Sequence, residues 1–214
     1  MHGRLGIVLS AVTVLTFIIA PAAISGQGPN DCVSPNFKCS PTTACNNQER
    51  WQLKHRMPSV VGQAQQVSVA DMLTWPDPQN IADTAVRKST SPIDDKEKNV
   101  YSLEGDVWIA KRAPDDCDVH MEITSVDGTN TGKRIIAEIP SNEYFDKIRQ
   151  VVMPKLGGST GHLTKSFRVK ITGLGFFDAS HWTSKNPVGN HHGSAAVGTL
   201  WEIHPVLNLE LVTP

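Results

Sequence analysis

The chain has 214 residues, of which 39% are hydrophobic and 19% charged, and its formal net charge is −1. The length allows one ordinary domain with extensions, and the composition excludes a coiled coil, a collagen, a wholly disordered chain and a multi-span membrane protein. The near-neutral charge argues against a nucleic-acid partner, because such proteins use a basic surface to neutralise phosphates.

The first 26 residues have the three parts of a secretory signal peptide. His2 and Arg4 precede an apolar run, Leu5–Ala20, and small residues follow it. We therefore expect cleavage at the end of residues 1–26, a secreted or periplasmic location, and a mature chain without a membrane span. The alternative is an uncleaved anchor, because the apolar run approaches the roughly 17 residues that can cross a bilayer.

Four cysteines are present, Cys32, Cys39, Cys45 and Cys117. An even number in an exported chain favours disulfides, and sequence alone leaves all three pairings open. A bridge to Cys117 would tie the N-terminal region to the following domain. Zinc is the competing interpretation, but the sequence has no C-x-x-C spacing.

Residues 27–98 form a Cys- and Pro-rich segment with little sustained periodicity. About 70 residues without a core of their own would be unusual as an independent unit, so we expect an extended N-terminal arm lying on the next domain. Within it, Ser68 is placed to cap a short helix over residues 69–73, which Pro76 ends.

Residues 99–214 carry the patterning of a folded domain. The sequence predicts a helix that begins after Ser141 and ends at Gly157-Gly158, and strands over residues 100–111, 118–125, 134–139, 167–177 and 199–211. The order is therefore β-β-β-α-β-β. This is the order of the OB fold, a mainly β, five-stranded Greek-key barrel. An immunoglobulin-like sandwich is the alternative, and the helix argues against it.

Four stretches of this domain, DVHMEI (118–123), IIAEIP (135–140), RVKITGLGFFDASH (168–181) and LWEIHPVLNLEL (200–211), resemble motifs of an uncharacterised family of exported bacterial proteins. The resemblance extends more loosely to residues 48–51, 54 and 100–101. It implies an exported bacterial protein with a single arm-plus-barrel unit. No activity comes with it.

Side-chain alternation along the strands points to one surface. It turns Trp201, Leu207 and Leu211 towards the core, and with them Ile203, Pro205 and Leu209. The residues between them face outward. In the strand order of an OB barrel, the outward residues of three strands then share one outer patch: Asp118, His120, Glu138, Glu202 and His204. His181, at the end of the fourth strand, is expected to lean over this patch.

Imidazoles and carboxylates in such a patch suit three roles. They could bind zinc, manganese or calcium, with His120, His204 and Asp118 as the ligands, or act as general acid and base. The structural alternative is cross-strand pairing, which any strand with one polar face produces. A further structural option is that the arm covers the patch, whose groups then make buried hydrogen bonds to the backbone of the arm.

Other features carry weaker signals. Alternation leaves Trp108 outward, where it could stack a sugar or a base, or be covered by the arm through Trp51 or Trp75. The paired His191-His192 could bind a transition metal. Gly173-Leu174-Gly175 lies inside a strand and indicates a bulge or bend. The sequence contains no G-x-S-x-G, P-loop or H-E-x-x-H motif.

The sequence therefore leads to two hypotheses. The first is an exported, non-enzymatic binding or structural module for a glycan, peptide or envelope component, monomeric and without a cofactor. The alternative is a metal-dependent hydrolase, most plausibly a phosphodiesterase, that uses the outer patch. The OB fold by itself carries no function.

Overall fold

The computed structural model describes residues 50–58, 63–184 and 193–213. The main body of this part consists of β2 (Val100–Arg112), β3 (Val119–Thr124), β4 (Arg134–Ile139), α4 (Asp146–Val152), β5 (His162–Phe177) and β6 (Val197–Val212). The predicted order of strands and helix is confirmed. β5 begins five residues before the predicted start, because its first residues are largely exposed and show no apolar alternation.

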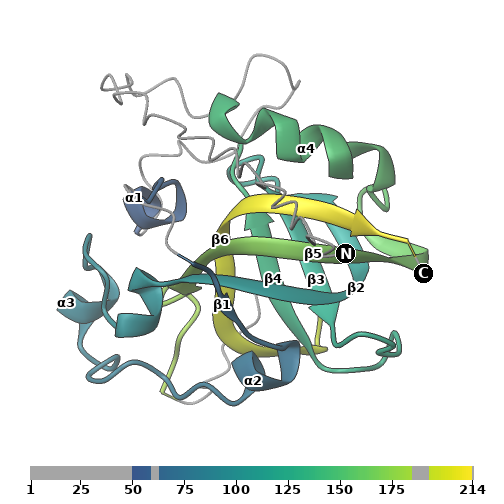
Figure 1. Cartoon of the computed structure of the whole chain (residues 1–214). Helices are drawn as coiled ribbons and strands as arrows, with labels where there is room; N and C mark the ends of the chain where they lie inside the picture. The colour runs from purple at the N-terminus through teal and green to yellow at the C-terminus, as the bar shows by residue number, and fades with distance from the viewer. Residues whose placement is uncertain (1–49, 59–62, 185–192, 214) are drawn as a thin grey trace, which may run out of the picture.

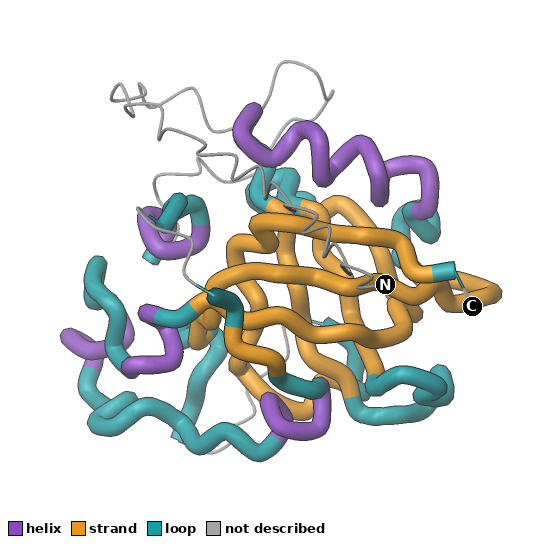
Figure 2. The backbone as a smooth tube through the Cα atoms, viewed as in Figure 1, coloured by secondary structure: helices purple, strands orange, loops and turns teal. Residues whose placement is uncertain are grey.

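The five strands close into a barrel (Figures 1 and 2). Neighbouring strands follow the order β2-β3-β4-β6-β5, and the pairing of β5 with β2 closes the barrel. The β4–β6 pair is parallel, and the other pairs within the barrel are antiparallel. This is the strand order of the OB fold. A single closed sheet excludes the immunoglobulin-like sandwich, which needs two separate sheets.

The inside of the barrel is apolar. Each strand contributes a fully buried side chain, for example Val107, Met121, Ala137, Ile171 and Ile203. These residues alternate with residues that point to the outside, as a pleated strand requires. The predicted inward assignment is correct for Trp201, Ile203 and Leu209 and wrong for Leu211, which is 42% exposed.

The pairing of β6 with β5 is irregular at two places. Thr172 of β5 pairs with Asn208, and the next residue, Gly173, pairs with Val206. Leu207 is therefore an extra residue on β6, and Val206 is buried in its place. A second register shift, between Gly173 and Gly175, offsets the first, so that Leu209 keeps the inward direction of Ile203. These shifts confirm the predicted bulge or bend at Gly173-Leu174-Gly175.

The helical segment is divided into η3 (Glu143–Phe145), α4 and η4 (Met153–Lys155). Its cap is Asn142, whose side chain accepts a hydrogen bond from the Tyr144 N–H. The prediction that Ser141 is the cap is wrong. The Ser141 N–H instead donates to Asp118 Oδ1, at 2.8 Å. Helix α4 lies beside the barrel, next to β6 (Figure 1).

The described part of the arm contains more structure than its sequence suggests. It comprises α1 (Trp51–Lys54), β1 (Gln65–Gln66), α2 (Val69–Leu73), α3 (Thr84–Arg87) and η2 (Asp95–Lys98). The predicted helix over 69–73 is confirmed, with a capping box between Ser68 and Asp71. β1 pairs in parallel with the start of β2, so the arm adds a strand to the barrel.

Several predictions concern residues outside the described part. These are the signal peptide or anchor at residues 1–26, the paired His191-His192, and three cysteines, Cys32, Cys39 and Cys45. Cys117 is fully buried and is not a free cysteine. In the described ranges, no helix combines the length and apolar character needed to cross a membrane.

Candidate functional site

The strand pairing brings the five predicted patch residues together. His120 of β3 pairs directly with Glu138 of β4, and Ala137 of β4 pairs with Ile203 of β6. His204 and Glu202 therefore lie beside Glu138 on the outer side of the sheet. We call the resulting group the His–carboxylate cluster; it comprises Asp118, His120, Glu122, Glu138, Glu202 and His204.

The cluster is buried rather than exposed, although it lies outside the barrel. Asp118, Glu138 and His204 have no exposed surface, and Glu202 is 2% exposed. The outer patch is therefore not open to solvent. The alternative that the arm lies over the patch agrees with the position of His55, whose Nε2 lies 3.9 Å from Asp118 Oδ2.

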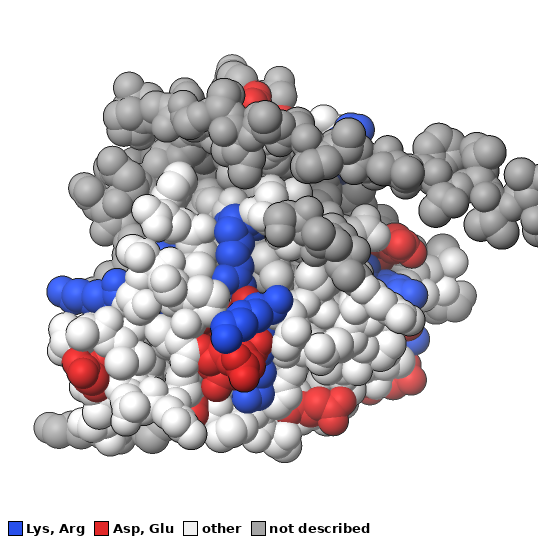
Figure 3. Space-filling view, turned by 60° about the vertical axis from the view of Figure 1, so that its left-hand side comes forward, with Lys and Arg blue, Asp and Glu red and all other residues white. Residues whose placement is uncertain are grey.

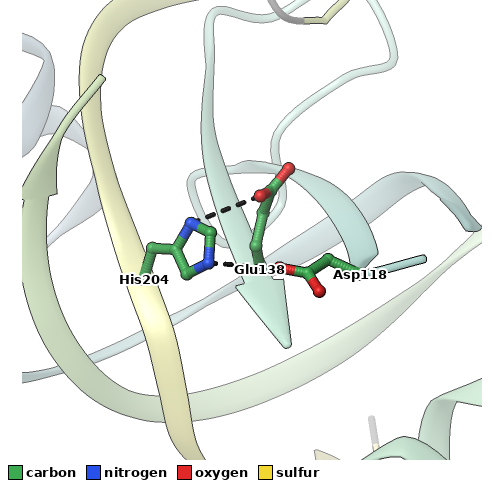
Figure 4. Close-up of side chains that lie close together, drawn as sticks. All are labelled: Asp118, Glu138 and His204. Atoms are coloured by element: carbon green, nitrogen blue, oxygen red, sulfur yellow. Dashed lines mark ion pairs between the residues drawn. The ribbon is translucent and has the colours of Figure 1, made fainter. Parts of the chain in front are cut away.

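Imidazoles and carboxylates alternate through the cluster. His204 Nε2 lies 3.3 Å from Asp118 Oδ2, and its Nδ1 lies 3.2 Å from Glu138 Oε2 and 3.5 Å from Glu202 Oε2. Figure 4 shows each nitrogen of the His204 ring facing one of the two nearer carboxylates. The other oxygen of Glu138 lies 2.7 Å from His120 Nδ1. A single network of ionisable groups thus crosses three strands.

At one end of the network, Arg134 pairs with Glu122. Glu122 Oε1 lies 3.6 Å from His120 Nε2, and its Oε2 accepts a hydrogen bond from Arg134 Nη1 at 2.8 Å. The backbone N–H and the hydroxyl of Ser194 also donate to Glu122. Burial alone would raise the pKa of Glu122, but hydrogen bonds from His120, Ser194 and Arg134 lower it to about 2. Glu122 is therefore an anion at neutral pH.

Among the residues that the structure describes, several polar atoms at the centre of the cluster make no hydrogen bond of good geometry. They are Asp118 Oδ2 and both ring nitrogens of His204. Each lies within ion-pair distance of a partner, but the geometry does not satisfy a hydrogen bond. Buried polar atoms of this kind are unusual, because most are satisfied in folded proteins.

The electrostatics of the centre reflect this burial. Burial, with help from Asp116, raises the pKa of Asp118 to about 6. Burial would lower the pKa of His204, but its contacts with Asp118 and Glu202 outweigh that effect and raise it to about 9. At neutral pH the two groups thus form an ion pair with a protonated His204.

The arm contributes a buried cation and a neutral imidazole. Burial disfavours the Lys54 ammonium, but Asp178, Glu138 and Glu202 hold its pKa above the ordinary value. Burial and the charges of His204 and Lys54 lower the pKa of His55 to about 3, so His55 is neutral. The ring of His55 stacks on Trp51, with 4.7 Å between the ring centroids.

A second polar contact joins the arm to the barrel through Glu97 in η2. Its carboxylate accepts two hydrogen bonds from Arg50, at 2.7 and 2.8 Å, and one from the backbone N–H of Phe177 at 2.9 Å. The Ile93 N–H donates to the same group at 2.7 Å. Because Glu97 is fully buried, these bonds replace its hydration completely.

His181 does not belong to the cluster. Its Nδ1 pairs with Asp178 Oδ2 just beyond the end of β5, and Ser180 Oγ donates to the other oxygen of Asp178. The side chain of His181 is 32% exposed. Asp178 itself interacts electrostatically with Lys54 and Glu202, so the pair lies at the border of the cluster.

Trp108 occupies an irregular position in β2. Val107 and Ile109 pair with consecutive residues of β3, so Trp108 is the extra residue of a bulge. It is half-buried, and its indole N–H has no hydrogen-bond partner. Trp75 of the arm packs on other aromatic rings of the barrel, 5.0 Å from Tyr101 and 5.4 Å from Trp201.

Sequence reasoning missed the contributions of the arm, namely Arg50, Lys54, His55 and Glu97. Arg50 and Lys54 were marked only by the loose family resemblance, and no pattern pointed to His55 or Glu97.

The face in Figure 3 is mostly uncharged, with basic and acidic side chains interleaved. That face therefore offers no continuous basic surface to a nucleic acid.

No protein-family model, no curated protein and no solved structure matches the chain. The resemblance to an exported bacterial family therefore stays a prediction.

Proposed function

We propose that this protein is an exported, non-enzymatic binding or structural module whose arm is attached to its barrel through the His–carboxylate cluster. One observation carries the proposal: the five predicted patch residues are at most 2% exposed. A catalytic acid, base or metal must reach its substrate within hydrogen-bond distance. Groups that are buried this completely are better suited to holding two parts of the chain together.

Contacts from the arm support this role. His55 approaches Asp118, and its Nδ1 lies 3.2 Å from the side-chain amide of Asn142. Lys54 interacts with carboxylates on several barrel elements. Arm and barrel thus share one buried polar layer, in which each side supplies charges that the other needs.

The ligand class that we propose is a glycan, a peptide or a component of the cell envelope. Trp108 is the candidate contact for a sugar, because a half-exposed aromatic ring on the first barrel strand can stack on a pyranose face. The balanced net charge fits a ligand of this kind better than a polyanion.

The test is an assay for the alternative, a metal-dependent hydrolase. Mature protein is incubated with bis(4-nitrophenyl) phosphate and Zn²⁺, Mn²⁺ or Ca²⁺, beside the variant Asp118→Asn. We expect no nitrophenol release above that of the metal and buffer alone, and a lower melting temperature for Asp118→Asn because it weakens a buried ion pair.

A matched control is Asp95→Asn, since the Asp95 side chain is 90% exposed. Metal-dependent turnover in the wild type and in Asp95→Asn, lost in a folded Asp118→Asn variant, would refute the proposal and establish the hydrolase.

A further inference from the structure

Three side chains of the cluster converge on one point. Asp118 precedes β3, Glu138 lies in β4 and His204 lies in β6, yet one donor atom of each lies within 4.8 Å of the other two. Figure 4 shows each of the two carboxylates facing one nitrogen of the His204 ring. Carboxylate oxygen and imidazole nitrogen are the ligands that zinc and related divalent ions prefer.

The hydrogen-bonding pattern points to a missing partner at the Asp118 side. Asp118 Oδ1 accepts a hydrogen bond from the Ser141 N–H, so the carboxylate is held in place. Its Oδ2 and the facing His204 Nε2 are completely buried, and within the described part of the chain neither atom makes a hydrogen bond of good geometry. Both atoms therefore present lone pairs, or a lone pair and a proton, to the same small space.

The spacing of these two atoms fits a shared metal ion. Bonds of about 2.0–2.1 Å at a tetrahedral angle place two ligand atoms about 3.3–3.4 Å apart. Asp118 Oδ2 and His204 Nε2 are 3.3 Å apart. At the second ring nitrogen, Glu138 Oε2 lies within ion-pair distance, 3.2 Å from Nδ1. A carboxylate behind a metal-bound histidine is a common arrangement, because it fixes the ring and its tautomer.

The charge balance agrees with a bound cation. Around the cluster, the described residues include three buried permanent cations, Lys54, Arg134 and Arg149, besides His204, which is protonated at neutral pH when no metal is bound. They also include seven buried carboxylates: Asp116, Asp118, Glu122, Glu138, Asp146, Asp178 and Glu202. Buried carboxylates need compensating positive charge, and a divalent ion supplies two charges at the point where the donors meet.

We propose that Asp118 Oδ2 and His204 Nε2 bind one divalent transition-metal ion, zinc by preference, and that Glu138 positions His204 through its Nδ1 hydrogen. In this arrangement His204 is neutral, and the ion takes the place of the proton between the two ligands. The inference rests on the proposed function only in treating the cluster as an attachment between arm and barrel. A metal here is structural and strengthens that attachment.

The experiment uses the full mature protein and the metal alone. Protein is stripped with a chelator, dialysed, and titrated with Zn²⁺ while bound zinc and melting temperature are measured. Co²⁺ is then added in place of Zn²⁺, because its visible absorption reports coordination by the protein. We expect one equivalent of metal per chain, a melting temperature that falls on stripping and returns with Zn²⁺, and a Co²⁺ spectrum.

Four variants assign the ligands. Asp118→Asn and His204→Gln are expected to lose the Co²⁺ spectrum and the zinc-dependent rise in melting temperature. Glu138→Gln is expected to weaken zinc binding about 10–100-fold, the usual effect of removing such a partner. His162→Gln replaces an exposed histidine on β5 and is expected to bind zinc as the wild type does.

The stripped wild type keeps the test independent of whether a variant folds. Less than one equivalent of zinc on stripped, folded wild type would overturn the proposal. So would an unchanged Co²⁺ spectrum in a folded Asp118→Asn variant. The phosphodiester assay is separate: turnover with metal bound would refute the proposed function and leave the metal site standing, whereas a protein that binds no metal and shows no turnover would refute the metal site and leave the proposed function standing.

Discussion

The two sides of the barrel wall are both buried, but they are built from opposite chemistry. Ile203 points into an apolar core, and its neighbour His204 points into a layer of carboxylates and imidazoles. Neither side chain has more than 1% of its surface exposed. Alternation along a strand therefore shows that its two faces have different surroundings, but it does not show that the polar face is in contact with solvent.

The difference between the two sides is a difference in what burial requires. An apolar side chain gains stability from leaving water whatever its neighbours are, in proportion to the area buried. A buried carboxylate or imidazole is stable only when particular partners replace its hydration. Conservative substitutions inside the barrel should therefore cost little stability at any pH. In the polar layer, a substitution that changes a single atom, or a change of pH, should alter stability strongly.

The largest effect is expected at Glu97, which joins the arm to the end of β5. Glu97→Gln keeps the shape but removes the charge that pairs with buried Arg50. Leaving one partner of a buried ion pair uncompensated costs about 3–5 kcal/mol. Urea unfolding measures the change. Glu104→Gln, at an exposed position of β2, is the control and should change stability by less than about 0.5 kcal/mol. A similar loss of stability in both variants would contradict the role of Glu97 in joining the arm to the barrel.

The next effect is a pH dependence at Glu122. Its folded pKa of about 2 is lower than its ordinary value of 4.5. A lowered folded pKa gives stability that is complete above about pH 4.5 and is lost as the pH falls towards 2. The shift corresponds to roughly 3 kcal/mol for this buried group. Glu122→Gln should therefore lose about that much at pH 7 and almost nothing near pH 2.

Thermal unfolding of both proteins between pH 2 and 7 measures this difference. Glu210→Gln, exposed on β6, should follow the wild type throughout. A constant difference between Glu122→Gln and the wild type at every pH would contradict the assignment, because a purely steric defect does not titrate.

The smallest effect is expected in the apolar interior. Ile123→Val removes one buried methyl group from the core and should cost about 0.5–1.5 kcal/mol, equally at pH 4 and pH 7. Val126→Ala, at a position that is 39% exposed, should cost less than about 0.5 kcal/mol. A pH-dependent loss of stability in Ile123→Val would mean that the apolar and polar sides of the barrel wall are coupled.

The strand and helix positions could be predicted because they depend on local pattern. The alternation in DVHMEI and RIIAEI, the turn residues between them and the capping box at Ser68 are short-range signals. The pattern failed where strands deviate from regular pairing, at Trp108 and Leu207. A bulge is set by the partner strand, so the sequence of one strand does not reveal it.

The OB-like order and the five side chains of the outer patch can be inferred from local patterns, because both follow from periodicity and from the topology that periodicity implies. The burial of the patch, and its completion by Lys54 and His55, depend on the folded structure. Burial depends on which distant segment lies over a surface, and here the covering residues are more than 60 positions away from Asp118 in the chain. Contacts at that separation leave no local pattern, since each partner is an ordinary polar residue until the fold brings them together.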